Sequence, residues 1–307
     1  MATWLVTGAG GGVGGSVCRE LLAQGEQVRG LDVRTPHPAE GLTGRRGFDL
    51  RIGDVRRSDV VHEAVQGVDA VLHMAALTIQ AADADPLAAL DVNSRAFVDL
   101  MEAAVSSPSH PVVVFASTAT LHNPNPTFTL TGSGEPPAGR APTPVNFYAA
   151  TKLFNELAAN HWRDKGLAVV ALRLGLVTFP WAGQGLTRQI VDGLVRRPVN
   201  GESGVVPCAD DHPNWLSPKN AAQACIGAAR AALAGTARQW YDVLGEQRSM
   251  REAIDVARGM FPAVQIEARP GVGGLDQRHL TSDLAELGVA VPDSLEEQLD
   301  SLRMSLS

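Results

Sequence analysis

Two side chains near the middle of the chain could move a proton. Tyr148 and Lys152 stand four residues apart in the stretch FYAATKLFNE, so on a helix they lie on one face. A free phenol has a pKa of about 10 and exchanges protons poorly at neutral pH. A nearby ammonium stabilises the phenolate and lowers that pKa. The pair could therefore work as an acid–base catalyst, although the same spacing also occurs in exposed helical pairs.

A second set of polar side chains follows the apolar run PVVVFASTAT. Ser117 and Thr118 end this predicted strand, and the carboxyl ends of strands are where ligands bind in open parallel sheets. A hydroxyl group there can donate a hydrogen bond to a substrate carbonyl. Asn93 interrupts the helical stretch DVNSRAF, where it is a poor helix former. Such a residue often bonds a neighbouring carbonyl or a water molecule.

A glycine-rich stretch, TGAGGGVGG, lies near the N-terminus between an apolar run and a helical pattern. Its spacing is Thr7-Gly8-x-x-Gly11-x-x-Gly14. A tight turn, close approach of the backbone to a pyrophosphate, and tight helix–sheet packing each require a glycine. The N-terminus of the following helix offers N–H groups and a partial positive charge to phosphates. In this strand–turn–helix context the pattern predicts a dinucleotide site.

Asp32 ends the next predicted strand, at a distance that suits an acid reaching the adenosine ribose. A carboxylate there accepts hydrogen bonds from both ribose hydroxyls and repels a 2′-phosphate, so the sequence favours NAD over NADP. Arg34, two residues later, could instead bind that phosphate. A positively charged nicotinamide ring would add to the effect of Lys152 on the phenol of Tyr148.

The elements that must position these groups alternate between strand and helix over the first half of the chain. The predicted strands are apolar throughout, which is typical of a parallel sheet covered on both faces. The sequence thus predicts an α/β fold, a Rossmann-type doubly wound parallel sheet. We expect an NAD-binding domain over residues 1–175, to which 214–245 returns, and a smaller C-terminal substrate-binding lobe over 176–307. Residues 122–146, rich in Pro, Gly and Thr, predict a long loop, which at this length is usually either functional or disordered.

Composition excludes several classes of partner. A net charge of −7 in 307 residues argues against nucleic acid and anionic membranes, which require clustered Lys and Arg. The three widely spaced cysteines indicate reduced thiols in a cytoplasmic protein. We expect no metal site, because CADDHPNW lacks a second cluster of ligands. The sequence predicts neither a signal peptide nor a membrane span.

Together these motifs resemble those of the extended short-chain dehydrogenase/reductases, a group that includes sugar-nucleotide epimerases and dehydratases. The similar stretches are TGAGGGVG, GDV, HMAA, DVNSRAF, FASTAT, YAATK and LRLGLVTFP. The resemblance implies catalysis by Thr118, Tyr148 and Lys152, with Asn93 in support. It also implies further cofactor contacts, which are Gly12, Val13, Asp54, Val55, Met74, Ala75 and Ala76.

Departures from the family pattern concern the substrate. Dehydratases usually place an Asp-Glu pair after the catalytic threonine, whereas this chain has Ala119-Thr120, so we do not expect dehydration. Many sugar-nucleotide enzymes carry an Asn that helps hold the diphosphate where this chain has Leu176. The stretch DDHPNWLSPKNAA resembles the subgroup that oxidises small sugar acids. The candidate substrate contacts are Thr78, Ala119, Thr120 and Leu176.

Three functions fit these motifs. The first is an NAD-dependent oxidoreductase that transfers a hydride between nicotinamide and a small hydroxylated substrate such as a sugar acid or hydroxy acid, with Tyr148 as acid and base. The second is a nucleotide-sugar 4-epimerase that retains its NAD. The third is a non-catalytic NAD(P) sensor, which the presence of Tyr148 and Lys152 disfavours. The resemblance also implies a homodimer through the helices matching residues 86–106 and 147–164, although these faces could instead pack on the sheet.

Overall fold

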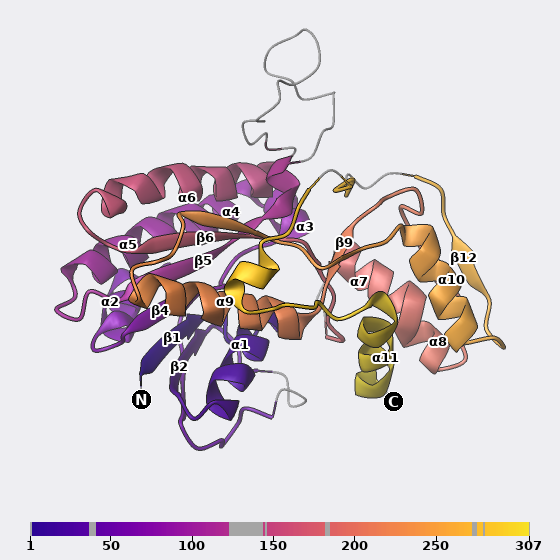
Figure 1. Cartoon of the computed structure of the whole chain (residues 1–307), viewed down its shortest axis with the longest axis horizontal. Helices are drawn as coiled ribbons and strands as arrows, with labels where there is room; N and C mark the ends of the chain where they lie inside the picture. The colour runs from indigo at the N-terminus through magenta and orange to yellow at the C-terminus, as the bar shows by residue number, and fades with distance from the viewer. Residues whose placement is uncertain are drawn as a thin grey trace, which may run out of the picture.

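The computed structural model of the chain describes residues 2–36, 41–122, 144, 146–181, 185–271, 275–278 and 280–306. Within these residues a parallel sheet of seven strands runs in the order β10-β6-β5-β4-β1-β2-β3 (Figure 1). This confirms the predicted Rossmann-type sheet. Its strands are β1 (Thr3–Thr7), β2 (Gln27–Asp32), β3 (Phe48–Ile52), β4 (Ala70–His73), β5 (Val112–Thr118), β6 (Val169–Leu174) and β10 (Trp240–Val243).

Helices cover both faces of the sheet, which explains why its central strands are apolar throughout. One face packs against α1 (Gly12–Ala23) and α9 (Pro218–Leu233). The other packs against α2 (Ser58–Val65), α5 (Ala96–Ser106) and α6 (Phe147–Arg163) (Figure 1). The two apolar cores therefore hold the carboxyl ends of the strands at a common edge, where side chains from β1, β4 and β5 can meet.

The helix predicted over residues 86–106 is not uniform. It consists of α4 (Pro86–Ala89), a π-helical segment (Leu90–Arg95) and α5. Asp85 caps its start by accepting a hydrogen bond from the amide of Ala88 at 3.0 Å. Asn93 lies in the π-helical segment and is buried. A π-helical turn accommodates an extra residue and is frequent at functional sites.

Most of the remaining described elements form a smaller lobe beside the carboxyl edge of the sheet (Figure 1). Its strands pair as β11-β9-β7 and β12-β8, and its core contains Leu194, Trp215 and Ile254. The chain leaves β6 for this lobe and then returns to the sheet through α9 and β10. The lobe elements are β7 (Leu176–Val177), α7 (Leu186–Val191), α8 (Arg197–Val199), β8 (Gly204–Val206), β9 (Asn214–Leu216), β11 (Glu246–Gln247), α10 (Met250–Met260), β12 (Ile266–Ala268) and α11 (Leu295–Leu306); α3 (Ile79–Ala84) follows β4.

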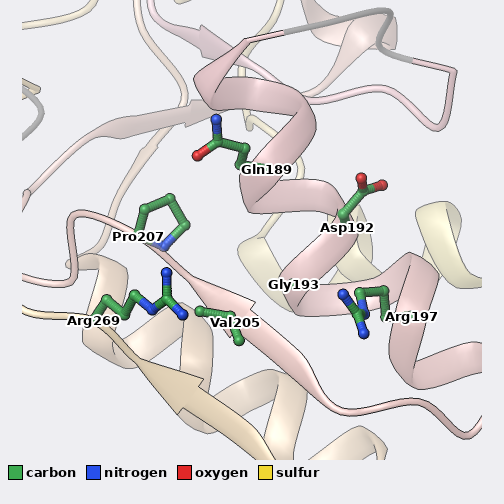
Figure 2. Close-up of a pocket in the computed structure, with 7 residues that line it drawn as sticks. All are labelled: Gln189, Asp192, Gly193, Arg197, Val205, Pro207 and Arg269. Carbon is green, nitrogen blue, oxygen red and sulfur yellow. The ribbon is translucent and has the colours of Figure 1, made fainter.

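A small cavity of about 230 Å³ lies within this lobe. Gln189, Pro207 and Arg269 surround one end of it, and Arg197 lies at the other (Figure 2). The residues predicted to be functional all lie elsewhere, so no sequence motif assigns a role to this cavity.

The long loop predicted over residues 122–146 lies outside the described residues, apart from His122, Pro144 and Asn146. Asn146 caps α6, because its side-chain oxygen accepts a hydrogen bond from the amide of Ala149 at 2.8 Å. This cap sets the start of the helix that carries Tyr148 and Lys152. Among the described helices, none combines the length and apolar character needed to cross a bilayer.

Candidate active site

A cavity of about 800 Å³ opens at the carboxyl edge of the sheet. Thr118, Tyr148 and Lys152 line it, although they come from β5 and α6. The structure thus brings the predicted catalytic residues to one place. Other predicted residues that line the cavity are Gly8, Gly11, Gly12, Val13, Gly14, Met74, Ala76, Thr78, Thr120 and Leu176. Those that do not line it are Asp32, Asp54, Val55, Ala75, Asn93 and Ala119.

Tyr148 and Lys152 lie on one face of α6, as predicted from their spacing. The Nζ atom of Lys152 is 5.6 Å from the centroid of the Tyr148 ring. Burial raises the pKa of Tyr148 to about 12 and lowers the pKa of Lys152 to about 8. Desolvation favours the neutral form of each group, so the lysine alone does not lower the pKa of the phenol as expected. Further positive charge in the cavity is required to stabilise a phenolate.

The ammonium group of Lys152 lacks hydrogen-bond acceptors within the described residues. The side chain is 1% exposed, and no described residue accepts a hydrogen bond from its Nζ atom. Nζ is not among the buried polar atoms that are sealed off without a partner, so it opens on the cavity, where desolvation still penalises its charge. The hydroxyl groups of a nicotinamide ribose would supply such acceptors, so Lys152 fits a bound dinucleotide.

The structure distinguishes two adjacent hydroxyl groups at the end of β5. Ser117 Oγ donates to Glu156 Oε1 at 2.5 Å, so it is committed to a buried carboxylate. Thr118 Oγ1 accepts from the amide of Thr120 at 3.3 Å and lies 2.9 Å from Thr120 Oγ1. Either hydroxyl group can donate across the contact between Thr118 and Thr120. When Thr120 donates, the hydroxyl hydrogen of Thr118 is available to a substrate oxygen. Thr118 is therefore the better candidate for orienting the substrate.

Asn93 holds two segments of the site together through its side-chain amide. Its Oδ1 accepts from the amide of Leu77 at 2.8 Å, and its Nδ2 donates to the carbonyl of Leu77 at 2.9 Å. The same Nδ2 lies 3.2 Å from Thr151 Oγ1 on α6. These bonds tie the segment after β4, which carries Met74 and Ala76, to the catalytic helix. Asn93 is thus a positioning residue in this structure.

The glycine-rich loop has almost no room for side chains. Gly8 has a φ of +71°, and a Cβ there would lie 2.7 Å from the amide nitrogen of Ala75. A Cβ on Gly14 would overlap the carbonyl oxygen of Gly8. The first glycine therefore makes the turn and the last allows α1 to pack on the sheet, as the pattern predicts. The loop presents bare backbone to the cavity, which fits a bound diphosphate.

Two acids among the predicted cofactor contacts, Asp32 and Asp54, already carry hydrogen bonds. Asp32 accepts from the amides of Gly10 and Arg34, each at 2.9 Å. Asp54 is bound by the guanidinium of Arg56 at 2.5 Å, and this hydrogen bonding lowers the pKa of Asp54. Asp32 thus joins the glycine-rich loop to the end of β2, and its contact with the ribose stays a prediction.

Several residues that line the cavity were not predicted from the sequence. Phe179 lies against the glycine-rich loop, since a Cβ on Gly12 would be 2.5 Å from its Cγ atom. It belongs to the stretch LRLGLVTFP, whose resemblance to the family singles out no individual residue. Leu275 and Gln277 come from the irregular last quarter of the chain, where no motif marked them. The cavity residues missed in this way include Gln80, Phe179, Trp181, Thr187, Leu275 and Gln277.

Comparison with known proteins adds independent findings. A model of the NAD dependent epimerase/dehydratase family matches residues 4–243. The chain is 33% identical over 264 residues to a 2-alkyl-3-oxoalkanoate reductase of Stenotrophomonas maltophilia, covering 82% of this chain and 73% of that protein. It is 33% identical over 190 residues to an L-arabinose 1-dehydrogenase (NAD(P)(+)) of Haloferax volcanii, covering 57% and 67%.

Other matches differ in length or show the fold alone. The chain spans 42% to 47% of the length of the UDP-glucuronate 4-epimerases of Arabidopsis thaliana that it also matches. The structure of UDP-glucose 4-epimerase from Thermus thermophilus in complex with NAD has a TM-score of 0.77 and 23% identity, covering 98% of this chain and 99% of that chain. This likeness supports the sheet topology described above.

The buried ammonium predicts an unusual effect on stability. The pKa of Lys152 falls from 10.5 to about 8 on folding, so at pH 7 folding bears the cost of burying the charge. We expect Lys152→Met to raise the free energy of unfolding of NAD-free protein by roughly 3 kcal/mol at pH 7. Between pH 8 and 10.5 the unfolded state binds more protons, so the wild type gains stability and the difference shrinks. Urea denaturation at both ends of this range measures it.

The matched control is Lys165→Met, which removes a lysine with a side chain 43% exposed. It should change the free energy of unfolding by less than about 0.5 kcal/mol at either pH. A Lys152→Met protein that is less stable than the wild type at pH 7 would contradict the assignment of an unpartnered ammonium.

From the carboxylate of Asp32 we predict a preference for NAD over NADP. Replacing it in Asp32→Asn removes the negative charge that would repel a 2′-phosphate and leaves Arg34 in place. We expect the ratio of the Kd of NADPH to that of NADH to fall by about tenfold or more, measured by fluorescence titration. Asp59→Asn, an exposed acid on α2, should leave the ratio unchanged. An unchanged ratio in Asp32→Asn would show that Asp32 only supports the loop.

Proposed function

Because the chain belongs to the NAD-dependent epimerase/dehydratase family, we propose that it is a dehydrogenase for a small hydroxylated substrate, such as a sugar acid or hydroxy acid. The observation that carries this proposal is the meeting of Thr118, Tyr148 and Lys152 with the glycine-rich loop in one cavity. Leu176 in the same cavity supports a small substrate, since it lacks the amide that holds a nucleotide diphosphate in many relatives. The matches to a reductase and to a sugar dehydrogenase also support it.

Each of the three proposed catalytic residues has a separate role in the reaction. Bound NAD supplies the hydride acceptor or donor. Tyr148 takes the proton of the substrate hydroxyl during oxidation and returns it during reduction. Thr118 holds the same substrate oxygen through its hydroxyl. Lys152 binds the ribose and, together with the charge of the oxidised cofactor, stabilises the phenolate against the desolvation that raises its pKa.

A nucleotide-sugar epimerase is the second candidate. The matches to UDP-glucuronate 4-epimerases favour it, at 28% to 30% identity. The same three catalytic residues would serve, with the hydride returned to the other face of the sugar. The two functions differ in whether the reduced cofactor leaves the protein. An epimerase keeps NAD through gel filtration and interconverts UDP-sugars without net NADH, whereas a dehydrogenase releases NADH into solution.

A substrate screen tests the dehydrogenase. Absorbance of NADH is followed with sugar acids, hydroxy acids, neutral sugars and small alcohols, using NAD and NADP in parallel. We expect Tyr148→Phe to lower kcat by about 10³-fold, because the proton acceptor is lost, and to change the Kd of NADH by less than about threefold. A wild-type protein that forms no NADH with any compound would overturn the proposal, and undiminished turnover in Tyr148→Phe would refute this role for the tyrosine.

The family resemblance and the surface both support a homodimer. Leu87 on α4 is 77% exposed, and Leu157 and Phe154 on α6 are 64% and 47% exposed. Phe147, Phe154 and Leu157 recur at the spacing of one helix face, away from the face that carries Tyr148. Exposed apolar side chains gathered on two contacting helices are typical of a protein interface.

Light scattering coupled to gel filtration tests this arrangement. We expect the wild type to elute as a dimer and Leu157→Glu to shift it to the monomer, because a buried carboxylate would oppose association. Met304→Glu, on an exposed apolar residue of α11, should stay dimeric. A monomeric wild type at micromolar concentration would exclude the homodimer.

The cysteines support a reducing, cytoplasmic location. Cys18 and Cys225 are buried and form no disulfide. Burial raises the pKa of Cys225 to about 12, so its thiol stays protonated and unreactive.

A further inference from the structure

We propose that Gln277 positions the substrate by donating a hydrogen bond from its Nε2 atom to a second substrate oxygen, other than the one that is oxidised. This inference rests on the proposed dehydrogenase function. It names a residue that no sequence motif marked and a chemical feature of the substrate. The second oxygen is an acceptor, such as that of a carboxylate or a carbonyl group.

Hydrogen bonds fix the orientation of the Gln277 side chain. Its Oε1 accepts from the backbone amide of Asn214 at 3.1 Å and lies 3.4 Å from Asn214 Nδ2. A backbone amide can only donate, so the atom facing it must be the oxygen. The backbone of Gln277 is held as well, because its amide donates to the carbonyl of His212 at 3.1 Å. The Nε2 atom must therefore point away from Asn214.

Gln277 lines the active-site cavity, and Nε2 is the polar side-chain atom that it can present there. The residue is 3% exposed, yet it lines that cavity. No described residue accepts a hydrogen bond from Nε2, and this atom is not among the buried polar atoms sealed off without a partner. A donor group that is buried by its neighbours and open only to a cavity needs an acceptor within that cavity.

The position of Gln277 is on the substrate side of the catalytic residues. Asn214 begins β9, which pairs with β7 in the register Leu176↔Trp215. Its carbonyl oxygen lies against Gly175, where an added Cβ would be 2.9 Å away. Gly175 and Leu176 also line the cavity, so the glutamine is anchored to the strand that leaves β6 beside Thr118.

The cavity that Gln277 lines also has apolar walls, which would make such a donor selective. Leu176, Trp181 and Leu275 line the same cavity and contribute mostly apolar surface. A substrate without an acceptor at this point would leave Nε2 unpaired in a dehydrated site, which a hydrogen-bonding pocket penalises strongly. An amide from the C-terminal lobe thus provides a polar contact in a region where Leu176 provides none.

The variant Gln277→Glu removes the Nε2 donor and keeps an oxygen that can accept from the amide of Asn214. One carboxylate oxygen still accepts from the amide of Asn214, while the other replaces the donor with an acceptor. The probes are 3-hydroxybutanoate, 4-hydroxypentan-2-one, pentan-2-ol and 4-aminopentan-2-ol, together with the best compound from the screen above. We expect kcat/KM to fall by about tenfold or more for probes with a second acceptor oxygen. It should change by less than about twofold for pentan-2-ol and rise for the amino alcohol.

Two controls separate a substrate contact from a structural role. Gln189→Glu makes the same change at the small lobe cavity (Figure 2) and should leave every probe unaffected. The Kd of NADH for Gln277→Glu should match that of the wild type, which shows that the cofactor region is intact.

The outcomes distinguish the two proposals. If Gln277→Glu lowers kcat/KM equally for all probes, or for none, or if pentan-2-ol is the preferred wild-type substrate, the role of Gln277 is refuted and the dehydrogenase stands. If the wild type forms no NADH with any probe or screened compound, the dehydrogenase proposal falls and this inference falls with it.

Discussion

A lysine ammonium buried beside a phenol is the constraint around which this site is organised. Lys152 is almost inaccessible, and desolvation lowers its pKa while raising that of Tyr148. Without a bound group, each residue is driven toward the neutral form, which is the wrong state for proton removal. For the proposed catalysis the pair would therefore be incomplete in the protein by itself, and cofactor binding would be coupled to acid–base chemistry through electrostatics.

The surrounding architecture keeps that pair in place through bonds distant from the reacting atoms. Asn93 fastens the segment after β4 to α6, and Gly8 packs its backbone against the same segment. Beneath the site, Arg173 forms a nearly buried ion pair with Glu156 at 2.7 Å, to which Ser117 also donates. These contacts join β5, which carries Thr118, and α6, which carries Tyr148 and Lys152, to the neighbouring strand β6. Rigid support of this kind preserves catalytic geometry.

The two ends of the cavity differ in the kind of residue that lines them. Glycines and backbone amides line the cofactor end, where a diphosphate requires close approach rather than side chains. Away from the glycines, the cavity is lined by apolar side chains such as Leu176 and Leu275 and by polar ones such as Thr78, Thr120 and Gln277. In folds of this type the sheet supplies common chemistry and the variable segments select the substrate.

The sequence alone was sufficient for the sheet and for the residues that share one element. Apolar strands, the glycine spacing and the four-residue separation of Tyr148 and Lys152 are local patterns, and local geometry fixes their consequences. Only the tertiary structure decided that Glu156 engages Ser117 from another element, which leaves Thr118 as the better candidate of the two neighbouring hydroxyl groups. It also placed Phe179 against Gly12 and turned Gln277 toward the cavity. Those arrangements depend on desolvation and on contacts between distant segments, such as the one that joins Gln277 to a residue 63 positions earlier, which no periodicity along the chain encodes.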